Sequence, residues 1–366
     1  MSALFKLHAL KTLDRIAGKL LCRCLPPLPR RPFLGELKSV LLIRPGGIGD
    51  AVLLIPTIRA LKQAFPYVTI DVLAEKRNGG VFHLCDVVNN IYLYDNLSGL
   101  RTLFCGRYDA VIDTEQWYRL SAIVARFISA PVKIGFATNE RRRMFTHGVP
   151  YDLDVYEPEN FASLLKPLGI DYQCGAAGAT LGVPSQSMSK ATQLLQPLCS
   201  GSFVSIFPGA SIPEKRWGAD CFRRVAEILT AFGVKIVVVG GKEDRQQGEV
   251  ITGGGLGLNL AGMTSLPETA AVIKKSSLLL SGDSGVLHIA VGLGVPTVSL
   301  FGPGSAWKWA PQGDRHIVIS NELPCSPCTV FGNTPPCPNN NRCMQDITVG
   351  EVVNAVTMLL AGVDSD

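Results

Sequence analysis

The first half of the chain alternates short apolar runs with longer stretches in which apolar residues recur at helical spacing. Four apolar runs predict buried strands, at residues 40–43, 69–73, 91–93 and 110–112. The clearest helical patterns between them lie at 51–65 and 120–128. Alternating strands and helices are typical of a doubly wound parallel sheet, because each parallel neighbour needs a crossover connection.

The same pattern begins again after a segment rich in Gly, Ala, Ser and Gln at 175–189 and a short helix at 190–195. Strands are predicted at 203–207, 235–239, 278–280 and 297–300, and helices at 219–232, 267–274 and 351–360. We therefore predict an arm at 1–38, an α/β domain at 39–185 and a second α/β domain at 186–366. Domains of this class bind ligands at the carboxyl ends of their strands, so we expect a cleft between the two.

The arm combines apolar and basic residues. Its apolar residues recur at helical spacing and are Leu4, Phe5, Leu10, Leu13, Ile16, Leu20 and Leu21. The arm holds eight basic residues and two acidic ones, and it ends in a proline-rich stretch at 26–32. Such an amphipathic helix either lies on an anionic membrane surface or packs on its own domain. Charges interrupt every apolar run, so no signal peptide is expected.

Charge and hydropathy limit the class of protein. The chain has a net charge of +5 and the arm alone carries +6, so we expect no nucleic-acid binding by the nearly neutral remainder. The apolar stretch at 278–301 contains Asp283, His288 and several glycines, which favours strand–helix–strand over a membrane span. A cytoplasmic protein is expected, in which the 11 cysteines are thiols or metal ligands rather than disulfides.

A loop with three glycines follows the first predicted strand and ends in an acid. The glycines are Gly46, Gly47 and Gly49, and Asp50 comes next. Asp50 is an N-cap in one interpretation, since an acid is favoured at a helix start. A cap does not require three glycines, which let another molecule approach the backbone, so the other interpretation is a general base for a hydroxyl group. The spacing is not G-x-G-x-x-G, so a dinucleotide site is not favoured, although Asp71 lies about where a ribose-binding acid is expected.

Three loops of the second half follow predicted strands and carry polar residues. These residues are Ser211 and Lys215, then Glu243, then Asp283, Ser284 and Gly285. A hydroxyl, a cation and a helix N-terminus together suit a diphosphate, and Glu243 suits ribose hydroxyl groups. His288 lies one helical turn beyond Ser284 and is either a core residue or part of this phosphate site.

An arginine run, Arg141-Arg142-Arg143, has two interpretations. Such a run is usually a solvated face. In a cleft it would instead attract a phosphorylated acceptor, because guanidinium pairs with phosphate through two parallel hydrogen bonds.

Four cysteines are clustered near the C-terminus. Cys325, Cys328, Cys337 and Cys343 lie within 19 residues, a spacing suited to a tetrahedral zinc or iron site. Four thiolates would fill every coordination position, so the role of the metal would be structural. The alternative is free thiols, or disulfides formed on oxidation in air.

Several ordered motifs resemble those of glycosyltransferase family 9, the ADP-heptose:lipopolysaccharide heptosyltransferases. The resemblance runs from about residue 39 to 360. Its motifs lie at 42–50, 207–210, 215–217, 238–243, 259–266, 282–290 and 300–303. It implies a GT-B architecture of two Rossmann-like domains and inverting sugar transfer that needs no catalytic metal or cofactor.

In the scheme that the resemblance implies, Asp50 takes the proton of the acceptor hydroxyl. The donor site comprises Ser211, Lys215, Glu243, Thr264, Asp283, Ser284, Gly285 and His288, with Thr264 beside the nucleotide base. The acceptor site comprises Gly46, Gly47, Gly49, Arg141 and Arg142. The implied partners are a nucleotide-sugar donor, ADP-heptose in this family, and a lipopolysaccharide-type or other lipid-linked surface glycan at the inner membrane.

The chain departs from the family pattern in two respects, and two other functions remain open. Ala51-Val52-Leu53-Leu54 follows Asp50, where core heptosyltransferases often carry a histidine, and the arm and cysteine cluster are absent from simpler members. An NAD-dependent oxidoreductase is one alternative, but it needs G-x-G-x-x-G after Ile43. A non-catalytic sugar-nucleotide-binding scaffold is the other, and the presence of both Asp50 and Lys215 argues against it.

Overall fold

The computed structural model describes residues 12–30, 33, 35–174, 178–198, 201–321 and 323–363. The chain divides into two compact units, Met1–Gly175 and Ala176–Asp366. The boundary lies between residues 175 and 176, whereas the sequence pattern places it between residues 185 and 186. Thr180 and Leu181 donate backbone hydrogen bonds to the carbonyl of Gly292, so this part of the linker belongs to the second unit.

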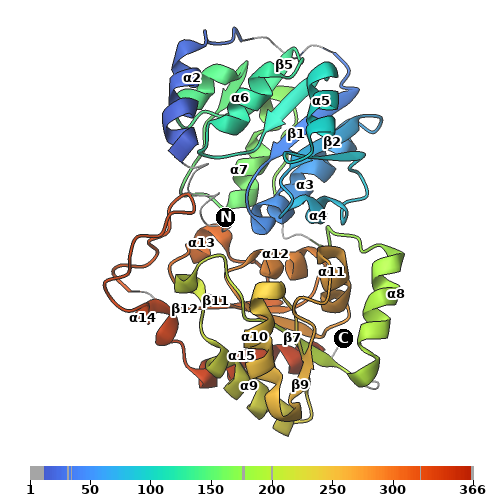
Figure 1. Cartoon of the computed structure of the whole chain (residues 1–366), viewed down its shortest axis with the longest axis vertical. Helices are drawn as coiled ribbons and strands as arrows, with labels where there is room; N and C mark the ends of the chain where they lie inside the picture. The colour runs from blue at the N-terminus through green and yellow to red at the C-terminus, as the bar shows by residue number, and fades with distance from the viewer. Residues whose placement is uncertain are drawn as a thin grey trace. The chain divides into compact units, whose positions relative to one another are not determined.

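The first unit is built on a parallel sheet (Figure 1). Among the residues described there, the sheet has six strands in the order β3-β2-β1-β4-β5-β6. They are β1 (Ser39–Arg44), β2 (Thr69–Ala74), β3 (Asn90–Leu93), β4 (Ala110–Asp113), β5 (Val132–Phe136) and β6 (His147–Val149). The chain runs from β1 to one edge and then continues on the other side with β4. The order therefore reverses between β1 and β4, where doubly wound folds place their ligands.

Helices of this unit pack on the sheet and on one another. They are α2 (Lys19–Cys24), α3 (Ile48–Ala64), α4 (Gly79–Phe82), α5 (Leu97–Cys105), α6 (Leu120–Phe127) and α7 (Glu157–Ser163). The core on one face joins Leu41, Ile43 and Val111 of the strands with Ala122 and Ala125 of α6. Helix α3 packs against α7. The buried strands need cover on both faces, which explains their continuous apolar character.

The second unit repeats this plan. Within its described part the strand order is β12-β11-β10-β7-β8-β9. The strands are β7 (Phe203–Phe207), β8 (Lys235–Val238), β9 (Gly257–Asn259), β10 (Leu278–Gly282), β11 (Thr297–Phe301) and β12 (His316–Ser320). Here the order reverses between β7 and β10. Both reversal points lie next to the first strand of their unit, as the βα alternation requires.

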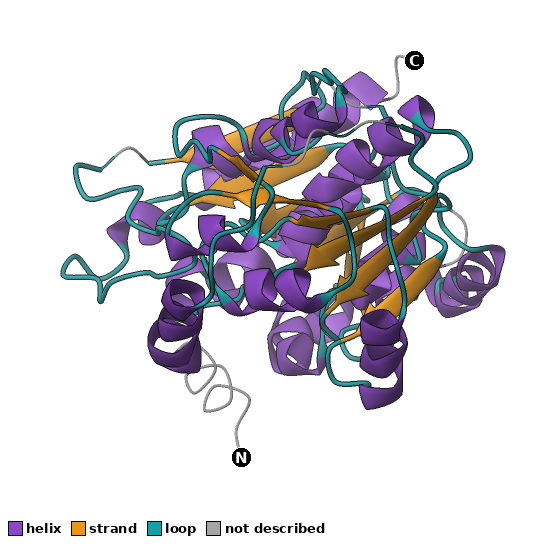
Figure 2. Cartoon of the chain, turned by 90° about the horizontal axis from the view of Figure 1, so that it is seen from above, coloured by secondary structure: helices purple, strands orange, loops and turns teal. Residues whose placement is uncertain are grey.

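Helices of the second unit pack on its sheet, and Figure 2 distinguishes the helices from the strands of the chain by colour. The helices are α8 (Ser185–Leu194), α9 (Ala219–Ala231), α10 (Arg245–Thr252), α11 (Leu266–Lys274), α12 (Gly285–Gly292), α13 (Ala306–Trp309), α14 (Arg342–Gln345) and α15 (Val349–Val363). One face of the sheet forms a core with α9 and α15, in which Phe222 and Val356 pack among Val204, Leu280 and Val298.

The predicted fold class is confirmed, since both units are doubly wound α/β sheets with a Rossmann-like strand order. The stretch 278–301 forms β10, α12 and β11, as predicted. No helix in the described ranges is both long and apolar enough to cross a membrane. The sequence pattern missed β5, β6, β9 and β12. Of these, β6, β9 and β12 lie at sheet edges, where partial exposure weakens the apolar signal.

The described part of the arm packs on the first unit. A π-helical turn (Asp14–Gly18) leads into α2, and the face with Asp14, Gly18 and Cys22 is buried. Asp14 Oδ1 accepts hydrogen bonds from the backbone N–H groups of Arg119 (2.6 Å) and Leu120 (2.8 Å) at the start of α6. Of the two interpretations of the arm, packing on its own domain is therefore confirmed for this part. The predicted apolar residues Leu4, Phe5 and Leu10 lie outside the described residues.

Candidate active site

The loop after β1 places Asp50 at the carboxyl edge of the first sheet. Helix α3 begins at Ile48 with Gly47 as N-cap, so Asp50 lies in the first turn and the N-cap interpretation is wrong. Gly46 has φ of +104°, a conformation that favours glycine, and a Cβ on Gly47 would lie 3.0 Å from Asp50 Oδ2. Gly49 also lies in the first turn of α3. The loop thus brings backbone without side chains close to the carboxylate.

Asp50 is hydrogen-bonded to a residue that the sequence analysis did not identify. Gln116 follows β4, the strand across the reversal point from β1, and its Nε2 donates to Asp50 Oδ1 (3.3 Å) and to Glu157 Oε1 (2.8 Å). The Gln116 Oε1 accepts from Arg44 Nη2 at 3.3 Å. The signal in the sequence was the polar pair Glu115-Gln116 shortly after a predicted strand, because polar residues in that position reach the same edge as Asp50.

Arg44 carries the positive charge of this cluster. Its side chain is buried, and its Nη2 lies 3.3 Å from Glu115 Oε2. Burial alone would lower the pKa of Arg44, but the charges of Asp50 and Glu115, with those of other nearby carboxylates, outweigh it and raise the pKa. Arg44 is therefore a permanent cation that compensates the acidic groups at this edge of the sheet.

The three arginines of the run have three different environments. Arg141 is fully buried, and its Nη2 lies 2.6 Å from Asp113 Oδ2. Arg142 is exposed. Arg143 donates from Nε to the carbonyl of Cys22 (3.1 Å) and holds the end of α2. Of the two predicted acceptor contacts, Arg142 thus presents its side chain to solvent, whereas Arg141 belongs to the interior.

In the second unit, the loops after β7 and β10 meet at the reversal point. Lys215 Nζ lies 2.5 Å from Asp283 Oδ2, and both side chains are mostly buried. Gly304, after β11, leaves no room for a side chain, because a Cβ there would collide with Asp283 Oδ2. The two predicted donor residues Lys215 and Asp283 are therefore brought together by the fold.

Ser284, next to Asp283 in the sequence, is the N-cap of helix α12. Its Oγ accepts from the backbone N–H of Leu287 (3.2 Å) and lies 2.8 Å from Ser281 Oγ. Gly285 is the first residue of α12. The N-terminus of this helix is suited to an anion. His288 is buried one turn further along the helix, with 4% exposed.

The remaining predicted donor residues lie on other loops at the carboxyl edge of the second sheet. Ser211 follows β7 and is exposed, and Glu243 follows β8 and is exposed with its carboxylate folded over Gly241. Thr264 follows β9, and its Oγ1 lies 2.7 Å from Thr269 Oγ1. The edge therefore presents hydroxyl groups, a carboxylate and a lysine together, as a nucleotide site requires.

The four clustered cysteines lie between β12 and α15. Asn339 Nδ2 donates to Cys325 Sγ (3.2 Å), and the backbone N–H of Asn341 donates to Cys337 Sγ (3.3 Å). Within the described ranges, however, no group of three or more His, Cys, Asp or Glu side chains is arranged to hold a metal ion. The prediction of a zinc or iron site is thus not confirmed.

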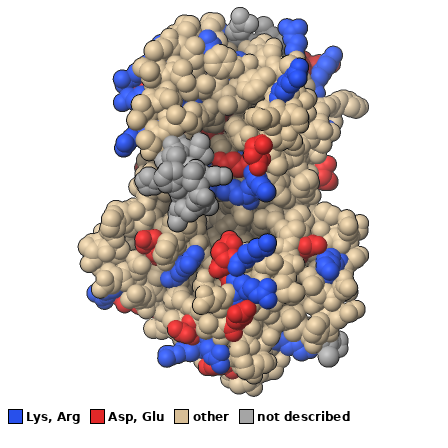
Figure 3. Space-filling model, viewed as in Figure 1, with Lys and Arg blue, Asp and Glu red and all other residues tan. Residues whose placement is uncertain are grey.

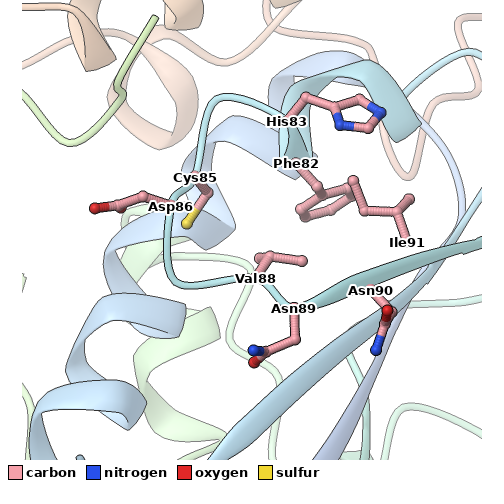
Figure 4. Close-up of a pocket in the computed structure, with 8 residues that line it drawn as sticks. All are labelled: Phe82, His83, Cys85, Asp86, Val88, Asn89, Asn90 and Ile91. Atoms are coloured by element: carbon pink, nitrogen blue, oxygen red, sulfur yellow. The ribbon is translucent and has the colours of Figure 1, made fainter. Parts of the chain in front are cut away.

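A separate open pocket of about 400 Å³ lies where the chain enters β3. Phe82, His83 and Cys85 line it together with Asn89 and Asn90 (Figure 4). It is at the amino end of β3, so it is not part of the cluster around Asp50. On the face seen in Figure 3, basic and acidic side chains are interspersed.

The chain is similar to several known proteins over most of its length. The lipopolysaccharide heptosyltransferase 3 of Escherichia coli is 29% identical over 293 residues, which are 74% of this chain and 85% of that protein. A glycosyltransferase family 9 structure from Veillonella parvula superposes with a TM-score of 0.78 at 21% identity, covering 91% of this chain and all of that one. The structure of Escherichia coli ADP-heptose lipopolysaccharide heptosyltransferase II gives 0.71 at 22% identity, covering 88% and 99%.

The family itself follows from the sequence. The sequence model of glycosyltransferase family 9 (heptosyltransferase) matches residues 98–337, which include β4 to β12 and therefore parts of both units. This match covers well over half of the chain, and the chain therefore belongs to glycosyltransferase family 9, the heptosyltransferases.

Proposed function

We propose that this glycosyltransferase moves a heptosyl residue from ADP-heptose to a lipopolysaccharide-type acceptor, with inversion at the anomeric carbon. One observation carries the proposal. Each unit gathers its polar residues at the point where the strand order reverses, Asp50 with Gln116 in the first unit and Lys215 with Asp283 in the second. A base and a site for an anionic leaving group are the two requirements of such a transfer. The name of the Escherichia coli relative supports the acceptor, and the name of the solved heptosyltransferase II supports both donor and acceptor.

The chemistry assigns one role to each unit. The acceptor hydroxyl attacks the anomeric carbon, and its proton passes to Asp50 as the new C–O bond forms. The bond from the anomeric carbon to the diphosphate breaks, and its electron pair stays on the diphosphate. Lys215 and the N–H groups at the start of α12, beside Ser284, stabilise that developing charge.

The remaining residues bind and orient the substrates. In the second unit, Glu243 holds the ribose and Thr264 lies beside the nucleotide base, while Ser211, Asp283, Gly285 and His288 line the diphosphate and sugar. In the first unit, the glycine loop and the exposed Arg142 contact the acceptor. Arg141 supports this region from the interior through its ion pair with Asp113.

The first test is ligand-dependent stabilisation followed by transfer. A ligand present at about 100 times its Kd adds roughly 2.7 kcal/mol to the free energy of unfolding, which a melting curve detects. We expect ADP to stabilise the protein more than UDP, GDP, CMP or NAD, and ADP-heptose to glycosylate a lipopolysaccharide that lacks its outer heptose. Stabilisation by NAD alone would favour the oxidoreductase, and ADP binding without any transfer would favour the scaffold.

We also propose that the arm rests on the cytoplasmic face of the inner membrane, where the acceptor is located. The face of the arm that points away from the first unit carries Leu13, Ile16 and Leu20, and Ile16 is 64% exposed. Arg15 and Lys19 are also on the arm and supply the charge that anionic lipids attract.

Vesicle sedimentation tests this membrane contact. The protein should sediment with vesicles containing phosphatidylglycerol, less so at high salt, and weakly with pure phosphatidylcholine. Ile16→Asp together with Leu20→Asp should abolish sedimentation without changing the melting temperature, because both side chains are exposed. If the double variant sediments as much as the wild-type protein, the arm does not bind the membrane.

We further propose that the four cysteines bind a structural zinc or iron ion once the metal is present. The donor set is chemically suitable, and two of the sulfur atoms already accept N–H hydrogen bonds, as thiolate ligands do. The segment is tied to the loop after β11, since the N–H of Cys328 donates to the carbonyl of Pro303 (3.0 Å). A bound ion would thus brace the loop that contains Gly304, beside the Lys215–Asp283 pair.

Metal analysis of the purified protein tests this site. We expect about one equivalent of zinc or iron, a lower melting temperature after chelation, and loss of the metal in Cys328→Ser. Metal-free protein with an unchanged melting temperature in that variant would contradict the proposal.

A further inference from the structure

Gln116 is fixed between two carboxylates of the first unit. Its Nε2 lies 2.8 Å from Glu157 Oε1 and 3.3 Å from Asp50 Oδ1, and only 7% of its surface is exposed. Glu157 is fully buried. The single amide group therefore joins the side chain of α7 to the carboxylate in the first turn of α3.

The orientation of this amide is determined by its partners. Arg44 donates only, and it faces the amide oxygen. The carboxylates of Asp50 and Glu157 accept when ionised, and they face the amide nitrogen. A flipped amide would place its N–H groups against the guanidinium and its oxygen against two carboxylates, so one orientation is strongly favoured.

Arg44 and Glu157, the residues on either side of the Gln116 amide, are each held by further hydrogen bonds. Arg44 Nη1 donates to the carbonyl of Thr114 (2.8 Å), two residues before Gln116. Glu157 Oε2 accepts from the Tyr151 hydroxyl (2.7 Å) and from Asn160 Nδ2 (3.4 Å). Gln116 thus has little freedom to move, and the position of its N–H groups is set by buried neighbours.

The two oxygens of Asp50 differ as a result. Oδ1 is occupied by the Gln116 amide. Oδ2 lies beside Gly47, where a Cβ would be only 3.0 Å away, and no hydrogen bond to another described residue involves it. Oδ2 is therefore the oxygen that faces the glycine loop, with lone pairs available for a proton.

We propose that Gln116, anchored by Glu157 and Arg44, is a positioning residue that holds Asp50 so that its Oδ2 receives the acceptor proton. This inference rests on the proposed role of Asp50 as base. In the transfer step the hydroxyl proton passes to Oδ2 while Gln116 keeps its hydrogen bond to Oδ1. The amide is neutral and donates, so it holds Oδ1 without adding a charge beside the base. A carboxylate in place of the amide would add a negative charge there.

Substitutions at residue 116 test the inference. Gln116→Leu should lower kcat about 10- to 100-fold, because Asp50 loses the group that orients it. Its Kd for ADP should stay within about twofold, since the donor residues belong to the other unit. Gln116→Glu should move the acidic limb of the kcat–pH profile upward by about one unit, because a second negative charge opposes ionisation of the base. A purely structural role predicts lower stability with an unshifted profile.

Substitutions at Glu157 distinguish the effect of its negative charge from the effect of its hydrogen bond to Gln116. Glu157→Gln keeps an oxygen that accepts from Gln116 and should retain most of the activity. Glu157→Ala removes that oxygen and should resemble Gln116→Leu. The matched control is Gln63→Leu, an exposed glutamine on α3, which should leave kcat unchanged.

The outcomes distinguish this inference from the proposed function. Wild-type kcat and pH profile in both Gln116 variants, with Asp50→Asn inactive, would overturn the positioning role and leave Asp50 as base. Full activity in Asp50→Asn would overturn both. If Gln116→Leu does not fold, the pH profile of Gln116→Glu still decides the question.

Discussion

Lys215 Nζ and Asp283 Oδ2 are 2.5 Å apart, although the two residues are separated by 68 positions in the sequence. Lys215 follows β7 and Asp283 follows β10, and these strands are neighbours in the second sheet. Asp283 therefore compensates the charge of a lysine that is largely withdrawn from solvent. A diphosphate would compete with Asp283 for the ammonium group.

Replacing Lys215 should weaken donor binding. Lys215→Ala removes a charge-assisted hydrogen bond, which contributes about 1.5–3 kcal/mol, so we expect the donor KM and the Kd for ADP to rise roughly 10- to 100-fold. Calorimetry with ADP and initial rates measure both. Lys275→Ala, at an exposed lysine of the same unit, is the control. An unchanged donor KM would show that Lys215 does not bind the diphosphate.

Replacing Asp50 should remove transfer while leaving donor binding intact. A general base contributes about 10²–10⁴-fold, so kcat of Asp50→Ala should fall by at least that factor. The Kd for ADP should remain within about twofold, because the proposed donor residues lie in the second unit. Single-turnover transfer from ADP-heptose measures the first quantity, and unaltered turnover would show that another group takes the proton.

Arg141 and Arg142 are adjacent in sequence and should respond in opposite ways. Arg141→Met leaves the fully buried Asp113 unpaired, which should cost about 3–5 kcal/mol of unfolding free energy. Burial already raises the pKa of Asp113 despite its partner, so the double variant Asp113→Asn with Arg141→Met should recover part of the loss. Urea unfolding measures these changes.

Arg142→Ala should instead change stability by less than about 0.5 kcal/mol, since this residue is exposed. Its effect is expected on the acceptor KM, which should rise because a phosphate-binding cation is lost. A destabilised Arg142→Ala, or an unchanged acceptor KM, would remove this residue from the acceptor site.

The arm should detach when Asp14 is replaced. Asp14 caps the start of α6 through the N–H groups of Arg119 and Leu120 and also lies 3.5 Å from Arg119 Nη1. Asp14→Ala removes these contacts and should cost about 1–2 kcal/mol, a typical loss for a helix cap. Hydrogen exchange should then rise in residues 12–24 and at the start of α6. Unchanged exchange in both segments would mean that other contacts hold the arm.

The second unit should lose stability in mild acid because of His316. Burial, reinforced by the charge of Arg315, lowers the pKa of His316 from 6.5 to about 4. The unfolded chain therefore binds a proton between these values that the folded protein does not, so stability falls as the pH drops from about 6.5 to about 4. Melting temperatures at pH 7.5 and 5 measure the effect. His316→Asn should reduce the difference, whereas His83→Asn, at an exposed histidine, should not.

The sequence by itself determined the two α/β halves, the glycine loop with Asp50 and the polar residues after the strands of the second half. These features are local, because apolar periodicity and glycine chemistry depend on neighbours in the chain. The apolar pattern did not predict the strands β6, β9 and β12 at or near the sheet edges, because short and partly exposed strands contain few consecutive apolar residues. The sequence also did not distinguish the environments of Arg141, Arg142 and Arg143, because all three positions carry the same residue type.

Tertiary structure alone decided which distant residues meet. Strand order places the loop after β4 beside the loop after β1, and so brings Gln116 to Asp50. The same arrangement in the second unit brings Asp283 to Lys215. A single sequence does not specify strand order, since it follows from how crossover helices pack on both faces of a twisted sheet. The hydrogen-bond partners of Asp50, the proposed base, and of Lys215, proposed to bind the diphosphate, therefore became visible only in the folded chain.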